Sequence, residues 1–123
     1  MKKFYIEFTF QKEGIHHYPA ALQLPELADV SFLGYPHRHM FHFTVKIEVL
    51  PDDREIEFIL AKRWAENLFD TGIIDANHKS CEMLAEEMVD QVIGKYGDRD
   101  VLVKVSEDGE NAGYCDYVAA KVK

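Results

Sequence analysis

The sequence predicts an α+β fold in which a four-stranded antiparallel sheet carries two helices packed on one face. Four segments alternate apolar and polar residues with the period of two that is typical of strands, and two segments between them repeat apolar residues with a helical period. The predicted order is therefore β-β-α-α-β-β. Because each strand has one apolar face and each helix one apolar stripe, a two-layer arrangement buries both.

The first two predicted strands cover residues 3–11 and 37–50. In the first strand, one face carries only apolar side chains, which are Phe4, Ile6, Phe8 and Phe10. The segment from about 12 to 36 contains three prolines and two glycines and has no sustained period. We therefore expect a long irregular excursion here, and loops of this length in compact domains are usually functional.

Two helices are expected to follow. Asp52 and Glu55 have the spacing of a capping box, after which an apolar stripe repeats every four residues until Gly72, namely Ile56, Leu60, Trp64 and Leu68. Ser80 can cap a second helix of about 81–95. Its stripe is Cys81, Leu84, Ala85, Met88 and Val92.

The last two predicted strands begin at Val101 and at residue 113. The first alternates Val101, Val103 and Val105 with polar positions, and the second covers residues 113–121 after a turn at residues 108–111. Such a sheet has two edges that must be covered or paired. Pairing between subunits is one solution, so a homo-oligomer is plausible.

Length and composition indicate a single domain spanning 1–123 of ordinary globular type, with 47% hydrophobic and 29% charged residues. A net charge of −8 argues against nucleic-acid binding, which depends on basic contacts to phosphates. Two isolated cysteines indicate a reduced, cytoplasmic protein rather than a disulfide framework. No signal peptide or membrane-spanning apolar run is expected.

The clearest functional signal is His37-Arg38-His39, which opens the second predicted strand. Both histidines continue the apolar face of that strand, so their imidazoles can converge on one metal ion. A third ligand is expected from the excursion or the end of the first strand, where both His16 and His17 are candidates. The alternative is that the histidines are hydrogen-bonded or solvated at the rim of the sheet.

Glu107 and Ser80 are candidate substrate-binding residues. Glu107 is in phase with the apolar face of the third strand, where its carboxylate could accept N–H groups from a pterin or guanine edge. If the strand ends at Ser106, Glu107 is simply solvated. Ser80 at a helix start is most often only an N-cap, although its hydroxyl could also contact a polar ligand.

The chain resembles the 6-pyruvoyltetrahydropterin synthase and 6-carboxytetrahydropterin synthase family, which has the tunnelling fold. Five motifs occur in the family's order and cover nearly the whole length. They are Phe8-Thr9-Phe10 with His16-His17, then His37-Arg38-His39, Ile56-Glu57-Phe58, Ser80-Cys81-Glu82-Met83-Leu84-Ala85 and Val103-Lys104-Val105-Ser106-Glu107.

This resemblance implies a zinc ion bound by His16, His37 and His39. It implies a reduced pterin, such as dihydroneopterin triphosphate, whose ring is anchored by Glu107 beside Ser80. It also implies homo-oligomers, trimers that stack as hexamers. The sequence does not separate biopterin-type from queuosine-type pathways.

Two departures from the family bear on catalysis. The family's catalytic Cys is replaced by Leu33, and its Leu-Asp-His motif becomes Phe69-Asp70-Thr71, which keeps the acid and loses the base. Leucine cannot serve as a thiolate, and threonine cannot replace an imidazole base near neutral pH. Asp70 remains as the candidate catalytic residue, and the alternative is a catalytically silent homologue that binds a pterin or purine.

Overall fold

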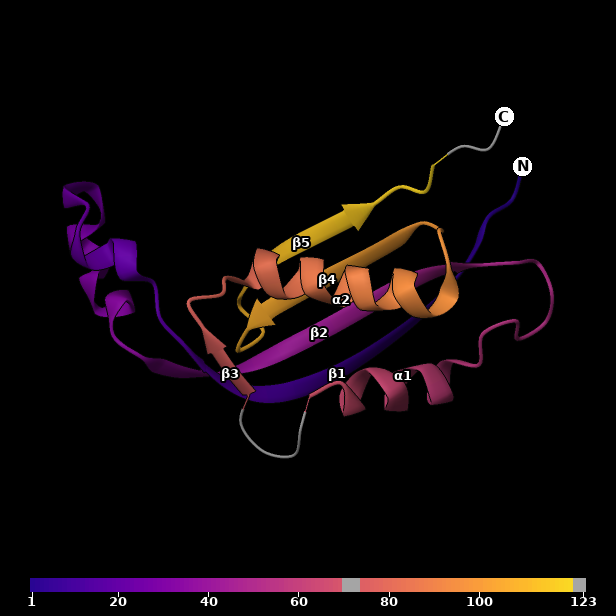
Figure 1. Cartoon of the computed structure of the whole chain (residues 1–123), viewed down its shortest axis with the longest axis horizontal. Coiled ribbons are helices and arrows are strands. Elements are labelled where there is room, and N and C mark those ends of the chain that lie inside the picture. The colour runs from indigo at the N-terminus through magenta and orange to yellow at the C-terminus, as the bar shows by residue number, and fades with distance from the viewer. Residues whose placement is uncertain (70–73, 121–123) are drawn as a thin grey trace.

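The computed structural model describes residues 1–69 and 74–120 of the 123-residue chain. A curled sheet carries two helices on one face, and an arm of two 3-10 helices projects beyond one end of the sheet (Figure 1). The elements in chain order are β1 (Phe4–His16), η1 (Pro19–Leu22), η2 (Pro25–Gly34), β2 (His37–Val49), α1 (Phe58–Asn67), β3 (Ile74–Asn77), α2 (Cys81–Tyr96), β4 (Val101–Glu107) and β5 (Asn111–Tyr117).

The long antiparallel pair of β1 and β2 forms the central part of the sheet. The two strands pair in antiparallel register from Phe4 opposite Val49 to His16 opposite His37. The first strand is therefore longer than the predicted 3–11, since Gly14 and its neighbours continue the ladder instead of opening the excursion. The excursion itself folds into η1 and η2, with Ala21 and Gly34 buried between them.

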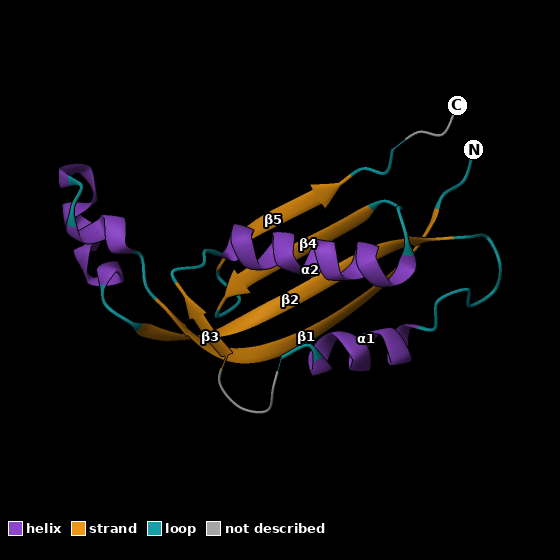
Figure 2. Ribbon diagram, viewed as in Figure 1, coloured by secondary structure: helices purple, strands orange, loops and turns teal. Residues whose placement is uncertain are grey.

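The sheet has five strands in the order β3-β1-β2-β4-β5, so the prediction of four antiparallel strands was wrong (Figure 2). The additional strand, β3, runs parallel to the end of β1. It is only four residues long, which is too short for a period of two to be visible in the sequence. The fourth predicted strand is β5, which covers Asn111–Tyr117 rather than 113–121.

The first helix begins later than the capping box predicted. Glu57 is the N-cap residue of α1, and its carboxylate accepts a hydrogen bond from the backbone N–H of Ile59 at 2.6 Å. Glu55 instead accepts from the backbone N–H of Leu50 and pairs with the Arg99 guanidinium at 3.0 Å. Because its carboxylate is bound by Leu50 and Arg99, Glu55 does not act as a capping residue.

The predicted stripe was only partly right. Ile56 is buried and Trp64 packs against the core, whereas Leu60 is 63% exposed and the buried positions within α1 are Ala61 and Ala65. Two alanines at i and i+4 let the helix lie close against β1, while the bulky side chains of its first turn, Phe58, Ile59 and Leu60, are exposed. The predicted stop at Gly72 lies outside the described residues. None of the described helices has the length and apolarity needed to cross a bilayer.

The second helix agrees with its prediction. Ser80 caps α2 by accepting a hydrogen bond from the backbone N–H of Met83 at 3.2 Å. The expected stripe packs onto the sheet with Met88, Val89 and Val92 buried. The start of α2 lies very close to β5, because a Cβ atom placed on Gly113 would come within 2.7 Å of the backbone nitrogen of Glu82.

This close approach gives a testable prediction. Gly113→Ala should destabilise the protein by about 1–3 kcal/mol, because a backbone atom cannot yield to the new methyl group. Gly94→Ala is the matched control: Gly94 lies inside α2 with nothing within 4 Å of its Cβ position. That change should stabilise by about 0.5–1 kcal/mol. Chemical denaturation measures both, and equal effects of the two changes would contradict the predicted packing.

Candidate metal centre

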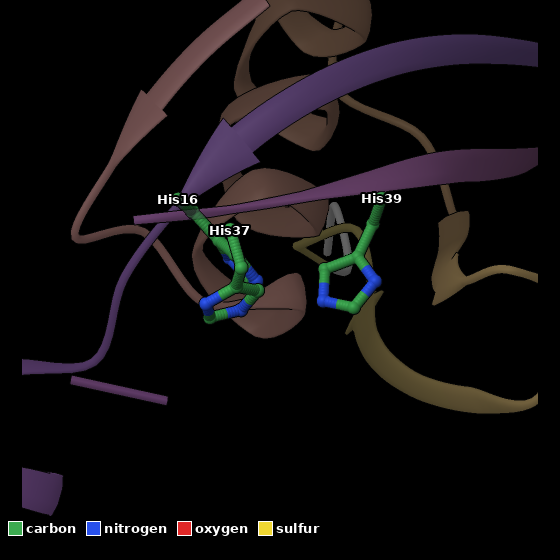
Figure 3. A group of neighbouring side chains, drawn as sticks. All are labelled: His16, His37 and His39. Carbon is green, nitrogen blue, oxygen red and sulfur yellow. The ribbon is translucent and has the colours of Figure 1, made fainter. Parts of the chain in front are cut away.

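The strand register brings three histidines together at one end of the sheet. His16 ends β1 directly opposite His37 at the start of β2, and His39 follows on the same face of β2. Figure 3 shows the three rings turned toward one another. One ligand atom from each histidine lies within 4.8 Å of the others. Of the two candidates that the sequence left open, the strand register places His16, and not His17, in this cluster.

Each imidazole is held through its Nδ1 atom. His16 Nδ1 lies 2.9 Å from the carbonyl oxygen of Lys79, and His37 Nδ1 lies 2.8 Å from that of Tyr35. His39 Nδ1 lies 2.7 Å from a carboxylate oxygen of Asp108. Carbonyl and carboxylate oxygens only accept hydrogen bonds, so each Nδ1 must donate. In the neutral rings, the proton is therefore on Nδ1 and the free lone pair is on Nε2.

This arrangement fits a divalent metal ion. Neutral imidazoles that donate through one nitrogen and offer the other to a metal are the usual ligands of zinc, and the outer hydrogen bond fixes the tautomer. Within the described residues, the buried Nε2 atom of His39 has no hydrogen-bond partner. Burial lowers the pKa of His16 below its ordinary value, although the Lys79 carbonyl and Glu107 oppose this. The neutral, metal-binding form is thus favoured.

Glu107 lies within β4, opposite Phe41 of β2, so the strand does not end at Ser106. Its carboxylate faces the histidines: Oε1 is 3.1 Å from His16 Nε2, and Oε2 is 3.5 Å from His39 Nε2. A carboxylate therefore stands beside two of the three free Nε2 atoms.

A pocket of about 530 Å³ opens beside the cluster. Its wall includes His16, His37 and Glu107, together with Ser80 at the start of α2, His17, and Leu33 from η2. Cys81 also lines it. Burial, together with the neighbouring Glu107 and Glu82 carboxylates, raises the pKa of the Cys81 thiol to about 12, so it stays protonated near neutral pH. The pocket is thus lined by candidate metal ligands, by the carboxylates of Glu107 and Glu82, and by a thiol that is protonated near neutral pH.

No family model matches this chain. No curated protein matches its sequence. Among solved structures, the chain is similar to the 6-pyruvoyl tetrahydropterin synthase of Caenorhabditis elegans. The TM-score is 0.69 and the sequence identity 13%, over 95% of this chain and 97% of that chain. The chain has the 6-pyruvoyl tetrahydropterin synthase fold. This confirms the fold expected from the order of the five motifs, and at this identity the likeness concerns the fold alone.

Sequence reasoning missed Asp108, which it treated as a turn residue. Its side chain accepts from His39 Nδ1 and, through the second oxygen, from the backbone N–H of Met40 at 2.9 Å. Those two hydrogen bonds hold the pKa of Asp108 below its ordinary value. Only the register between β2 and β4 reveals this contact. The candidate catalytic Asp70, and Thr71 beside it, lie outside the described residues.

Proposed function

We propose that this chain is a zinc-dependent protein of the 6-pyruvoyl- and 6-carboxytetrahydropterin synthase type that acts on a reduced pterin such as dihydroneopterin triphosphate. The observation that carries the proposal is the set of three Nδ1-anchored histidines beside a pocket of pterin size. The likeness in fold to a protein with that name gives independent support.

In this proposal one group of residues binds the metal and another binds the ring of the substrate. His16, His37 and His39 would hold zinc through Nε2, and the bound ion would supply Lewis acidity toward the side-chain oxygens of the substrate. Glu107 and Ser80 line the same pocket and would contact the heterocycle. A carboxylate suits a pterin edge because it can accept two parallel N–H bonds. Asp70 is proposed as the acid–base residue retained from the family motif.

The Asp108–His39 hydrogen bond should matter for metal affinity. Asp108→Asn cannot accept as strongly from Nδ1, so the ring loses orientation and basicity, and zinc affinity should fall about 10- to 100-fold. Competition with a chromophoric chelator measures this. Glu110→Gln, in the same turn but with no hydrogen bond or ion pair to His39 among the described residues, is the control and should leave affinity unchanged. Equal affinities of the wild type and Asp108→Asn would show that this carboxylate does not support the site.

A second candidate function is binding without turnover. Leu33 lines the pocket but has no ionisable group, and the Cys81 thiol stays protonated near neutral pH. Neither side chain can supply the thiolate that the family uses as a nucleophile or base. This favours a catalytically silent homologue that binds a pterin or purine.

One incubation separates the two functions. Purified, zinc-loaded protein is mixed with dihydroneopterin triphosphate, and the products are followed by mass spectrometry. A product of altered mass that requires His37 supports the enzyme. Unchanged substrate, together with a ligand-dependent rise in melting temperature, supports the binding protein. If the protein showed no turnover and no ligand-dependent stabilisation, both proposed functions would be contradicted.

A further inference from the structure

Glu107 faces atoms that should repel it. The three Nδ1 atoms donate to oxygen acceptors, so His16 Nε2 and His39 Nε2 present lone pairs in the neutral rings. The Glu107 oxygens approach these lone pairs to 3.1 Å and 3.5 Å. A carboxylate and two lone pairs at such distances require a positive charge between them, which is either a proton on one Nε2 or a single divalent ion bound by all three groups.

The distances agree with the shape of a four-coordinate site. Zinc lies about 2.0–2.1 Å from imidazole nitrogen and about 2.0–2.2 Å from carboxylate oxygen, so the ligand atoms of a tetrahedral site are about 3.3–3.5 Å apart. The 3.1 Å distance lies just below that range and the 3.5 Å distance at its upper end, whereas the histidine ligand atoms are up to 4.8 Å apart, so ion binding requires the rings to move closer together.

We propose that Glu107 is the fourth ligand of the metal in the ligand-free protein, which closes a site of three histidines and one glutamate. This proposal rests on the proposed metal function and adds to it. The same carboxylate is the proposed ring anchor, so a pterin entering the pocket must draw Glu107 away from the metal. Metal binding and ring binding then compete for one side chain.

Glu107 stands at the end of β4 and Cys81 at the start of α2, and both side chains line the same pocket. The neighbouring Glu107 carboxylate contributes to the raised pKa of the Cys81 thiol.

The test uses the full chain and zinc alone. Zinc affinity is measured by chelator competition for wild type, Glu107→Gln and Glu107→Ala, with Glu110→Gln as the control from the adjacent turn. Both Glu107 changes should weaken zinc binding by about 10-fold or more, and the control should not. Two Glu107 variants are used so that a folding failure of one, visible by circular dichroism, leaves the other informative.

X-ray absorption at the zinc edge of the wild type gives the second readout. Four nitrogen or oxygen neighbours with a carboxylate signal that disappears in Glu107→Ala support the proposal. A sulfur neighbour at about 2.3 Å would assign the fourth position to Cys81 and overturn it. Unchanged zinc affinity in folded Glu107→Ala would overturn it while leaving the three-histidine site intact. Failure of the wild type to bind zinc would instead refute the proposed metal function as well.

Discussion

His39→Ala is expected to weaken zinc binding by about 100-fold or more. Four-ligand zinc sites in small protein domains have apparent binding free energies of about 10–16 kcal/mol, or roughly 3 kcal/mol for each ligand, and each 1.4 kcal/mol is tenfold in affinity. His39 supplies one of three converging Nε2 atoms, and its ring is already oriented by Asp108. Zinc content after dialysis and chelator competition measure the loss.

The matched control is His42→Ala. His42 lies on the same strand, but its side chain belongs to the opposite face of the sheet and is not in the cluster. Removing it should leave zinc content at the wild-type level. If the two variants lost zinc equally, or if neither lost any, the cluster would not be the metal site.

Phe43→Ala is expected to have the largest effect on stability. Phe43 is 1% exposed, and its ring stacks on that of Phe10 with centroids 4.8 Å apart. It also contacts Phe69 at 5.2 Å. Truncating a buried phenylalanine removes its transfer free energy and leaves a cavity, which together cost about 3–5 kcal/mol. Urea denaturation, with fluorescence of Trp64 as the probe, measures the change.

Phe58→Ala is the control for this prediction. Phe58 opens α1 and is 54% exposed, so its loss should change the free energy of unfolding by no more than about 0.5 kcal/mol. A cost below about 1 kcal/mol for Phe43→Ala would mean that this stack of rings is not the centre of the core. In that case, the assignment of the inner face of β2 would be wrong.

The sequence predicted those features whose signal is local and periodic. The alternation in β2 and β4 identified the core face, and the spacing of His37 and His39 pointed to a candidate metal site on it. Ser80 was recognisable as a cap because its partner is three residues away. These predictions required only the geometry of a single element.

The features that the sequence did not reveal depend on pairing between elements. β3 is a strand only because the end of β1 offers it an edge, and Glu55 fails as a cap because Arg99 pairs with it. His16 could be separated from His17 only by its register opposite His37. The role of Asp108 can be recognised only once the end of β4 is known to lie beside His39 on β2. Long-range contacts of this kind leave no periodic pattern in one sequence.

The most direct test of the metal centre is a crystal structure of protein purified without chelators, with diffraction recorded above and below the zinc absorption edge. We expect one anomalous peak about 2.0–2.1 Å from the Nε2 atoms of His16, His37 and His39. Ordered rings that point apart with no peak between them, in crystals grown with added zinc, would contradict the metal site and leave only the fold.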